Sequence, residues 1–127
     1  FFTFWFRFIY KYNYMLEIEN YDAVKTIINR DYETFSGLML ERYFKRVLIE
    51  SKKYTRIGSW WNRKGENEID IVAENELDQQ ALFIEVKRKI DNYDPQLLNS
   101  KIAAFTRTTG RFKNYTVTQK GVSLEDM

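Results

Sequence analysis

Three short stretches between residues 55 and 89 constrain the fold most, because each predicts a β-strand and only a few residues separate them. The stretches are rich in β-branched and aromatic residues, and they are residues 55–61 (TRIGSWW), 68–75 (EIDIVAEN) and 81–89 (ALFIEVKRK). Gly58 suggests a bulge in the first. In the second, Ile69 and Ile71 alternate with Asp70 and Val72. Short connections join antiparallel neighbours, so the three stretches predict a meander.

Helices are predicted on both sides of this meander. Residues 21–29 and 31–54 carry apolar residues at spacings of three and four, which is the helical repeat. Thr34 and Ser36 are candidate caps of the second helix. We therefore expect two helices ahead of the strands.

After the meander, residues 94–110 predict a helix with well-marked ends. Asp94 is a candidate N-cap, Pro95 would take the first helical position, and Gly110 would end the helix. Residues 113–119 (KNYTVTQ) predict a last strand. The element order α–β–β–β–α–β predicts an α/β domain with a mixed sheet flanked by helices.

The third predicted strand combines apolar and ionic residues on one face. Side chains at i and i+2 of a strand point the same way, so Phe83, Glu85 and Lys87 share a face. An exposed Glu–Lys pair on a half-solvated strand contributes little to stability. The same pair could instead be half of an active site. These residues alone leave both interpretations open.

The available side-chain chemistry narrows the second interpretation. The chain has no cysteine and no histidine, which excludes thiolate–zinc sites and His-based acid–base catalysis. Asp70 precedes Glu85 by fifteen residues on the neighbouring strand, and Glu41 on the helix ahead is a candidate third acid. One lysine, Lys87, cannot balance three carboxylates, whereas Mg²⁺ or Mn²⁺ can. We expect Asp70, Glu85 and the Val86 carbonyl to hold the ion, with Lys87 acting on water during phosphodiester hydrolysis.

The stretches NEIDIVA and ALFIEVKRK, with Glu41 ahead of them, resemble the PD-(D/E)xK nuclease superfamily and its restriction-endonuclease-like core. FWFRFIY, IGSWWNRKGENEIDIVA and FIEVK are more closely similar to the C-terminal domain of unknown function of archaeal- and bacterial-type AAA+ ATPases. The resemblance covers nearly the whole chain. It implies that Asp70 and Glu85 are metal ligands, Lys87 the catalytic lysine, Glu41 the helix acid and Gln96 a polar active-site residue.

Two departures accompany the resemblance. Ile69 stands before Asp70, where many members of the superfamily have proline. No phosphate-binding Gly-Lys-Ser/Thr loop is present, so this chain is not itself an ATPase. In the similar family the domain follows a P-loop ATPase module and a winged-helix segment. We therefore expect a fragment of a longer ATPase, in which residues 1–30 form an aromatic and helical extension that packs on a nuclease-like domain, residues 31–127.

The net charge of +2 is spread unevenly along the chain. Basic runs flank an acidic centre at residues 66–78, an arrangement suited to a polyanion such as DNA held over a metal site. Charge runs are also typical of solvated surfaces. The residues expected to contact DNA without sequence specificity are Lys52, Lys53, Arg56, Arg63, Lys64 and Lys101.

The aromatic residues 1–14 (FFTFWFRFIYKYNY) are too short a stretch to span a membrane, and Arg7 lies at their centre. No signal peptide is evident, so a cytoplasmic protein without membrane attachment is expected. Two functional classes stay open. One is a Mg²⁺-dependent DNA endonuclease attached to an ATPase, and the other is a non-catalytic DNA-binding or regulatory module of that ATPase.

Overall fold

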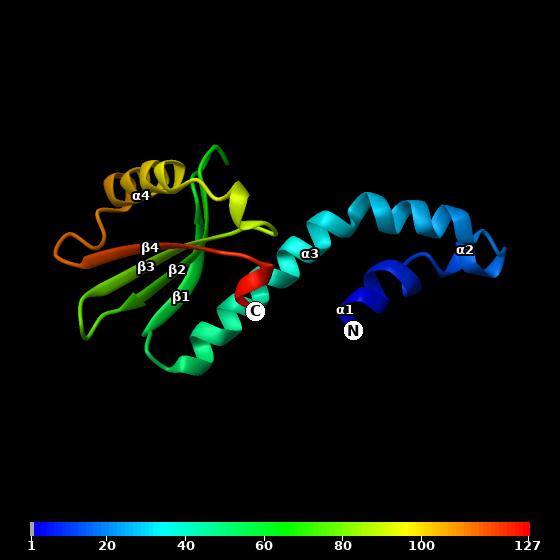
Figure 1. The fold of residues 1–127 in the computed structure, drawn as a ribbon, viewed down its shortest axis with the longest axis horizontal. Coiled ribbons are helices and arrows are strands. Elements are labelled where there is room, and N and C mark those ends of the chain that lie inside the picture. Colours follow the sequence, from blue (N-terminus) through cyan, green and yellow to red (C-terminus); the bar gives the residue numbers. More distant parts are fainter. Residues whose placement is uncertain (1) are drawn as a thin grey trace. The chain divides into compact units, whose positions relative to one another are not determined.

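The computed structural model describes residues 2–127 and shows an α/β fold with one four-stranded sheet (Figure 1). Phe1, the first residue of the expected extension, lies outside the described residues. The chain divides into two compact units, Phe1–Ser36 and Gly37–Met127. All the carboxylates and the lysine of the expected metal site belong to the second unit.

A few of the aromatic residues in the N-terminal unit form a small core, while several others are exposed. It contains α1 (Phe2–Phe4), the π-helical segment η1 (Trp5–Tyr10), α2 (Asn13–Glu17) and the start of α3 (Tyr21–Ser51). Phe8 is fully buried, and its ring centroid lies 4.9 Å from that of Phe4 and 5.3 Å from that of Phe35 on α3. None of the helices in residues 2–127 is both long enough and apolar enough to cross a bilayer.

One continuous helix, α3, replaces the two helices predicted for residues 21–29 and 31–54. Neither glycine nor proline interrupts the segment between them, and Arg30 pairs with Asp31 at 2.9 Å inside the helix. The candidate caps were wrong as well. The Ser36 hydroxyl donates to the Glu33 carbonyl at 3.2 Å, as serine can do within a helix, so a hydroxyl alone does not mark a helix end.

The predicted meander is confirmed. The strands are β1 (Arg56–Trp61), β2 (Glu68–Asn75), β3 (Gln80–Val86) and β4 (Thr116–Val122). β1, β2 and β3 pair antiparallel in that order, and β4 pairs parallel with β3, which makes the sheet mixed. β3 ends before the consecutive cations of residues 87–89, earlier than predicted. β4 begins three residues later than predicted, because it pairs only with β3 at the sheet edge and lacks a clear apolar alternation.

Helices cover both faces of the sheet (Figure 1). α4 (Pro95–Thr109) packs on one face, and residues 37–51 of α3 pack on the other. The buried residues on the α4 side are Ile69, Val72, Ala81, Phe83, Leu98, Phe105 and Phe112. Those on the α3 side are Leu40, Phe44, Ile71, Ile84 and Val122. The opposite orientation of successive β3 residues is therefore confirmed.

The ends of α4 are as predicted. Asp94 accepts hydrogen bonds from the backbone N–H groups of Gln96 and Leu97 at 3.0 and 3.3 Å, and Pro95 follows it. Gly110 ends the helix with φ of 66°, a left-handed conformation that favours glycine. These caps fix where the side chains of α4 meet the sheet.

The pairing of β1 with β2 contains a bulge that changes the side-chain alternation in β2. Gly58 pairs with Val72 and Trp60 with Ile69, so two steps along β1 match three along β2. As a result Ile69 and Val72 both belong to the core under α4. The predicted alternation, with Ile69 and Ile71 on one face, was wrong. The extra residue lies next to Asp70.

Candidate active site

The bulge directs the Asp70 carboxylate toward the end of β3. Regular pairing of these strands ends at Ile71 and Ile84. Beyond it, Asp70 Oδ2 accepts a hydrogen bond from the Val86 N–H at 2.8 Å. Bulges commonly redirect side chains near functional sites. This bond brings Asp70 next to the Glu85–Val86 segment, so three of the expected ligand groups lie at one end of the sheet.

Glu85 lies on the α4 face of β3 and is only 6% exposed. Its Oε1 contacts Lys101 Nζ of α4 at 3.1 Å and Lys87 Nζ at 3.4 Å. Its Oε2 is buried and, among residues 2–127, has no hydrogen-bond partner. A buried carboxylate oxygen without a partner is destabilising, and a cation beside it would remove that cost.

Asp70 has a pKa raised from 3.8 to about 6. Burial is the main cause, because it disfavours the charged carboxylate. The hydrogen bond from Val86 opposes the rise, and the nearby charges of Glu85, Glu41 and Glu68 add to it. Near neutral pH the carboxylate is therefore ionised at a cost in stability, in surroundings that favour an added positive charge.

Glu41 of α3 approaches the site from the other face of the sheet. Its Oε1 lies 2.9 Å from Lys45 Nζ and 3.4 Å from the Ser59 hydroxyl. That hydroxyl donates to the Asp70 carbonyl at 2.6 Å and accepts from Lys45 at 2.6 Å. Glu41 is thus connected to the Asp70 backbone rather than to its carboxylate. Lys45, four residues after Glu41, and Ser59, beside the bulge, were not among the predicted site residues.

Tyr93 and Gly121 lie beside Glu85. Gly121 stands opposite Glu85 in the β3–β4 register, and a Cβ added at Gly121 would overlap the Tyr93 ring. The pKa of Tyr93 is raised by burial and by the neighbouring charges of Glu85 and Asp94. The absence of a side chain at Gly121 therefore lets the tyrosine ring lie against β4 next to the candidate site.

The donor set fits a hard divalent cation. Carboxylate and carbonyl oxygens from Asp70, Glu85 and Val86 are the ligands that Mg²⁺ and Mn²⁺ prefer. Among them, Glu85 Oε2 has no hydrogen-bond partner in the part of the chain that the structure describes. As the side chains stand, no three acidic groups in residues 2–127 are gathered closely enough to enclose an ion. Lysines provide the positive charge beside Glu85 and Glu41 instead.

Gln96 lies exposed in the first turn of α4. Its backbone N–H binds the Asp94 cap, and its carbonyl accepts from Ser100 at 3.1 Å. The structure does not show its side chain at Asp70 or Glu85, and a role for Gln96 in the site stays a prediction.

The basic residues expected to contact DNA fall into three places. Three of them, Lys52, Lys53 and Arg56, lie near the β2–β3 hairpin, at the opposite end of the sheet from Asp70. Lys52 and Lys53 line a cavity there. Arg56 is paired with Glu74 in the register of β1 and β2. Arg63 and Lys64 lie on the β1–β2 turn, at the Asp70 end. Lys101 lies within the candidate site, 15% exposed, with its ammonium on Glu85.

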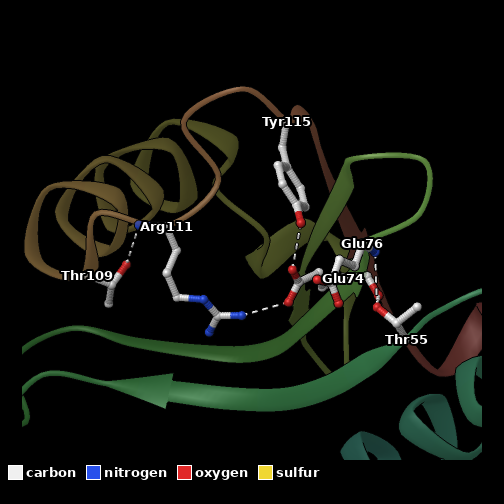
Figure 2. A network of polar contacts seen from close by, with 6 residues as sticks. All are labelled: Thr55, Glu74, Glu76, Thr109, Arg111 and Tyr115. Atoms are coloured by element: carbon white, nitrogen blue, oxygen red, sulfur yellow. Dashed lines mark hydrogen bonds and ion pairs between the residues drawn. The ribbon is translucent and has the colours of Figure 1, made fainter.

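A second polar cluster lies toward the hairpin end of the sheet (Figure 2). Glu74 of β2 is 12% exposed and accepts hydrogen bonds from Arg111 Nη2 at 2.7 Å and from the Tyr115 hydroxyl at 2.8 Å. Thr55 adds a link by accepting from the Glu76 N–H at 3.0 Å. Both Glu74 carboxylate oxygens accept a hydrogen bond, so we interpret this cluster as a structural contact that holds the loop after α4 against β2.

Comparison with known proteins places these observations in a family. The matching family model is described as archaeal and bacterial proteins of unknown function and covers residues 5–101, which include Glu41, Asp70, Glu85 and Lys101. An uncharacterised protein of Methanocaldococcus jannaschii is 38% identical over 96 residues, and the match covers 70% of this chain and 21% of that protein. The chain thus spans about a fifth of the length of that relative. No solved structure matches it significantly. The chain belongs to DUF234, the family of archaeal and bacterial proteins of unknown function.

Proposed function

We propose that residues 37–127 act as a Mg²⁺-dependent nuclease of the PD-(D/E)xK type, which hydrolyses phosphodiester bonds in DNA. The observation that carries the proposal is the meeting of Asp70 with the end of β3. The 2.8 Å bond to the Val86 N–H places Asp70 beside a buried glutamate, and a lysine follows that glutamate by two residues. This combination of side chains suits phosphodiester hydrolysis assisted by a metal ion.

Asp70, Glu85 and the Val86 carbonyl would hold the ion, with Glu41 close by. Bound Mg²⁺ would polarise the phosphate and lower the pKa of a coordinated water. The protein fixes the positions of the two carboxylates: the bulge directs Asp70 toward β3, and burial restricts the side chain of Glu85. Lys87 is 37% exposed, so its ammonium can reach both Glu85 and solvent. As a hydrogen-bond donor, Lys87 would orient the attacking water or a phosphate oxygen.

We also propose that this domain works within a longer polypeptide, after an ATPase module and a winged-helix segment. The similarity of FWFRFIY, IGSWWNRKGENEIDIVA and FIEVK to the C-terminal domains of AAA+ ATPases supports this arrangement. The small share of the archaeal relative that the match covers, 21%, is consistent with a multidomain parent. Co-purification of this chain with the separately expressed preceding domains would test the arrangement.

The test of the nuclease combines metal binding with cleavage. Calorimetric titration with Mn²⁺ should show binding to the wild type and none to Asp70→Ala. Lys87→Ala should keep Mn²⁺ binding and lose nicking of supercoiled DNA in Mg²⁺, because Lys87 acts on water rather than on the ion. Lys89→Ala is a matched control, since Lys89 is exposed and two residues further along. Equal Mn²⁺ binding by the wild type and Asp70→Ala would exclude the site.

A second candidate is a non-catalytic DNA-binding or regulatory module. The observation that favours it is the pairing of the carboxylates with lysines: Glu85 contacts both Lys87 and Lys101, and Glu41 contacts Lys45. Such pairs could stabilise the fold without a metal. On this alternative, DNA binding would persist in every variant above, and neither Mn²⁺ binding nor nicking would be found for the wild type.

A further inference from the structure

A groove of about 420 Å³ lies between the β1–β2 turn and α4. Residues from both segments line it, and those from the strand and turn are Trp60, Asn62, Arg63, Lys64, Glu66 and Asn67. α4 contributes Ala104, Arg107 and Thr108. The groove is thus formed by parts of the chain about forty residues apart.

The charge of this groove is predominantly positive. Arg63, Lys64 and Arg107 line it against a single acid, Glu66. All three basic side chains are exposed, and among residues 2–127 none of them takes part in an ion pair. The lysines of the candidate metal site differ, because each contacts a carboxylate. The three cations are therefore available to an external anion.

The walls of the groove are held in place. Asn62 Oδ1 accepts from the backbone N–H groups of Glu66 and Asn67 at 2.8 and 3.3 Å, and the Asn62 N–H donates to the Asn67 carbonyl at 3.0 Å. Gly65, with φ of 70°, supplies the left-handed position that this turn needs. On the inner side, the ring of Trp60 packs edge-on against the ring of Phe105, with their centroids 5.3 Å apart. Little ordering of these segments is needed on binding.

The groove adjoins the candidate metal site through β1 and β2, the two strands that its turn connects. Asn67 precedes Asp70 by three residues, at the entry to β2. Trp60 follows Ser59, whose hydroxyl donates to the Asp70 carbonyl. An extended anion in the groove would therefore continue toward Asp70. Lys52 and Lys53 lie at the other end of the sheet and could not bind the same short segment.

We propose that this groove binds the phosphate backbone of a single nucleic-acid strand, with Arg63, Lys64 and Arg107 contacting its phosphates. The proposal deepens the nuclease function by stating where the strand lies, and its catalytic meaning rests on that function. Binding itself needs no metal. Because phosphate contacts carry no sequence information, this binding is indifferent to sequence and weakens steeply with salt.

The test is fluorescence anisotropy with a labelled single-stranded oligonucleotide in EDTA, over a salt series, using the full chain. For single strands each phosphate contact contributes roughly 0.7 to the slope of log affinity against log salt. Arg63→Gln and Arg107→Gln should each lower the slope by about that amount and weaken binding to all sequences alike. Lys113→Gln is the matched control and should bind like the wild type, because Lys113 is exposed and lies just before β4, whose first residue pairs with Gln80 at the far end of the sheet.

The outcomes separate the groove from the nuclease proposal. If Arg63→Gln and Arg107→Gln bind like the wild type, or if Lys113→Gln loses as much affinity as they do, the proposal that this groove binds nucleic acid is wrong. Mn²⁺ binding would still decide the metal site. If the wild type binds no Mn²⁺ yet the groove variants lose affinity as described, the groove stands and the nuclease does not. Matching melting temperatures of the variants would exclude unfolding as the cause.

Discussion

Replacing Asp70 with asparagine tests the electrostatics of the site without a substrate. The change keeps the shape of the side chain and an oxygen that can accept from the Val86 N–H, while it removes the negative charge. The folded-state pKa of Asp70 is raised from 3.8 to about 6, a difference of roughly two pH units. At 1.36 kcal/mol per unit, ionising Asp70 costs the folded protein about 3 kcal/mol.

The sign of the effect follows from the raised pKa. Proton binding to Asp70 favours the folded state, and this contribution is complete below pH 3.8 and is lost as the pH rises through about 6. The asparagine variant resembles protonated Asp70 at every pH. Asp70→Asn should therefore match the wild type near pH 4 and exceed it by about 3 kcal/mol at pH 8 in EDTA, which corresponds to a rise in Tm on the order of 10 °C.

Thermal melts followed by circular dichroism between pH 4 and pH 8, with EDTA and with Mg²⁺, measure this effect. Mg²⁺ at a hundred times its Kd should stabilise the wild type by about 2.7 kcal/mol and should leave Asp70→Asn unchanged. Asp91→Asn is the matched control, since Asp91 is exposed and undergoes the same chemical change. An Asp70→Asn variant that is less stable than the wild type at pH 8, and indifferent to both pH and Mg²⁺, would refute the reasoning.

Two further predictions concern the frame around the site. Gly121→Ala should destabilise the fold by about 1–3 kcal/mol because its Cβ would overlap the Tyr93 ring, whereas Gly37→Ala, whose Cβ meets open space in a helix, should add up to about 1 kcal/mol. Equal melting temperatures of these two variants would contradict the packing. Glu74→Gln should lower the free energy of unfolding by about 1–2 kcal/mol, less than for a fully buried pair, because Arg111 is 38% exposed. A double-mutant cycle with Arg111→Met measures the coupling, and a coupling energy near zero would exclude the pair as a stabilising tie.

The parts of the fold that could be predicted are those with local signals. The caps of α4 depend on Asp94, Pro95 and Gly110, which are neighbours of the elements they delimit. The orientation of Phe83 and Glu85 follows from strand parity alone, and the α4 core and the contact with α4 agree with it. Where one residue type determines one local conformation, the sequence is sufficient.

The parts that could not be predicted depend on pairing between distant segments. Gly58 correctly predicted where the pairing of β1 with β2 is irregular, but the extra residue lies in β2, and no residue of β2 signals it. The extra residue redirects Asp70. A regular β2 would have placed Ile69 and Ile71 on one face, as we expected. The edge strand β4 shows the same limit, because its position depends on β3 rather than on its own side chains.

Charge runs posed a different difficulty, because a sequence shows which residues are basic and not what neutralises them. The sequence predicts DNA contact for Lys101 as it does for Lys52 and Lys53. Lys101 is largely buried against Glu85, however, whereas Lys52 and Lys53 are exposed. Lys45 was not predicted as a site residue, although its spacing of four from Glu41 is typical of a helical ion pair. Burial and partners, not residue type, separate a lysine of the site from a lysine of the surface.

The same comparison of partners distinguishes Asp70 among the acids of the site. Glu41 and Glu85 each contact at least one lysine, whereas Asp70, within the part of the chain that the structure describes, is held by the Val86 N–H and by no cation. One neutral donor lowers the cost of a buried charge without removing it, and accordingly the pKa of Asp70 stays raised to about 6. If a metal binds here, its charge most directly stabilises Asp70. Loss of that one carboxylate should then remove more metal affinity than loss of Glu41, whose charge Lys45 already balances.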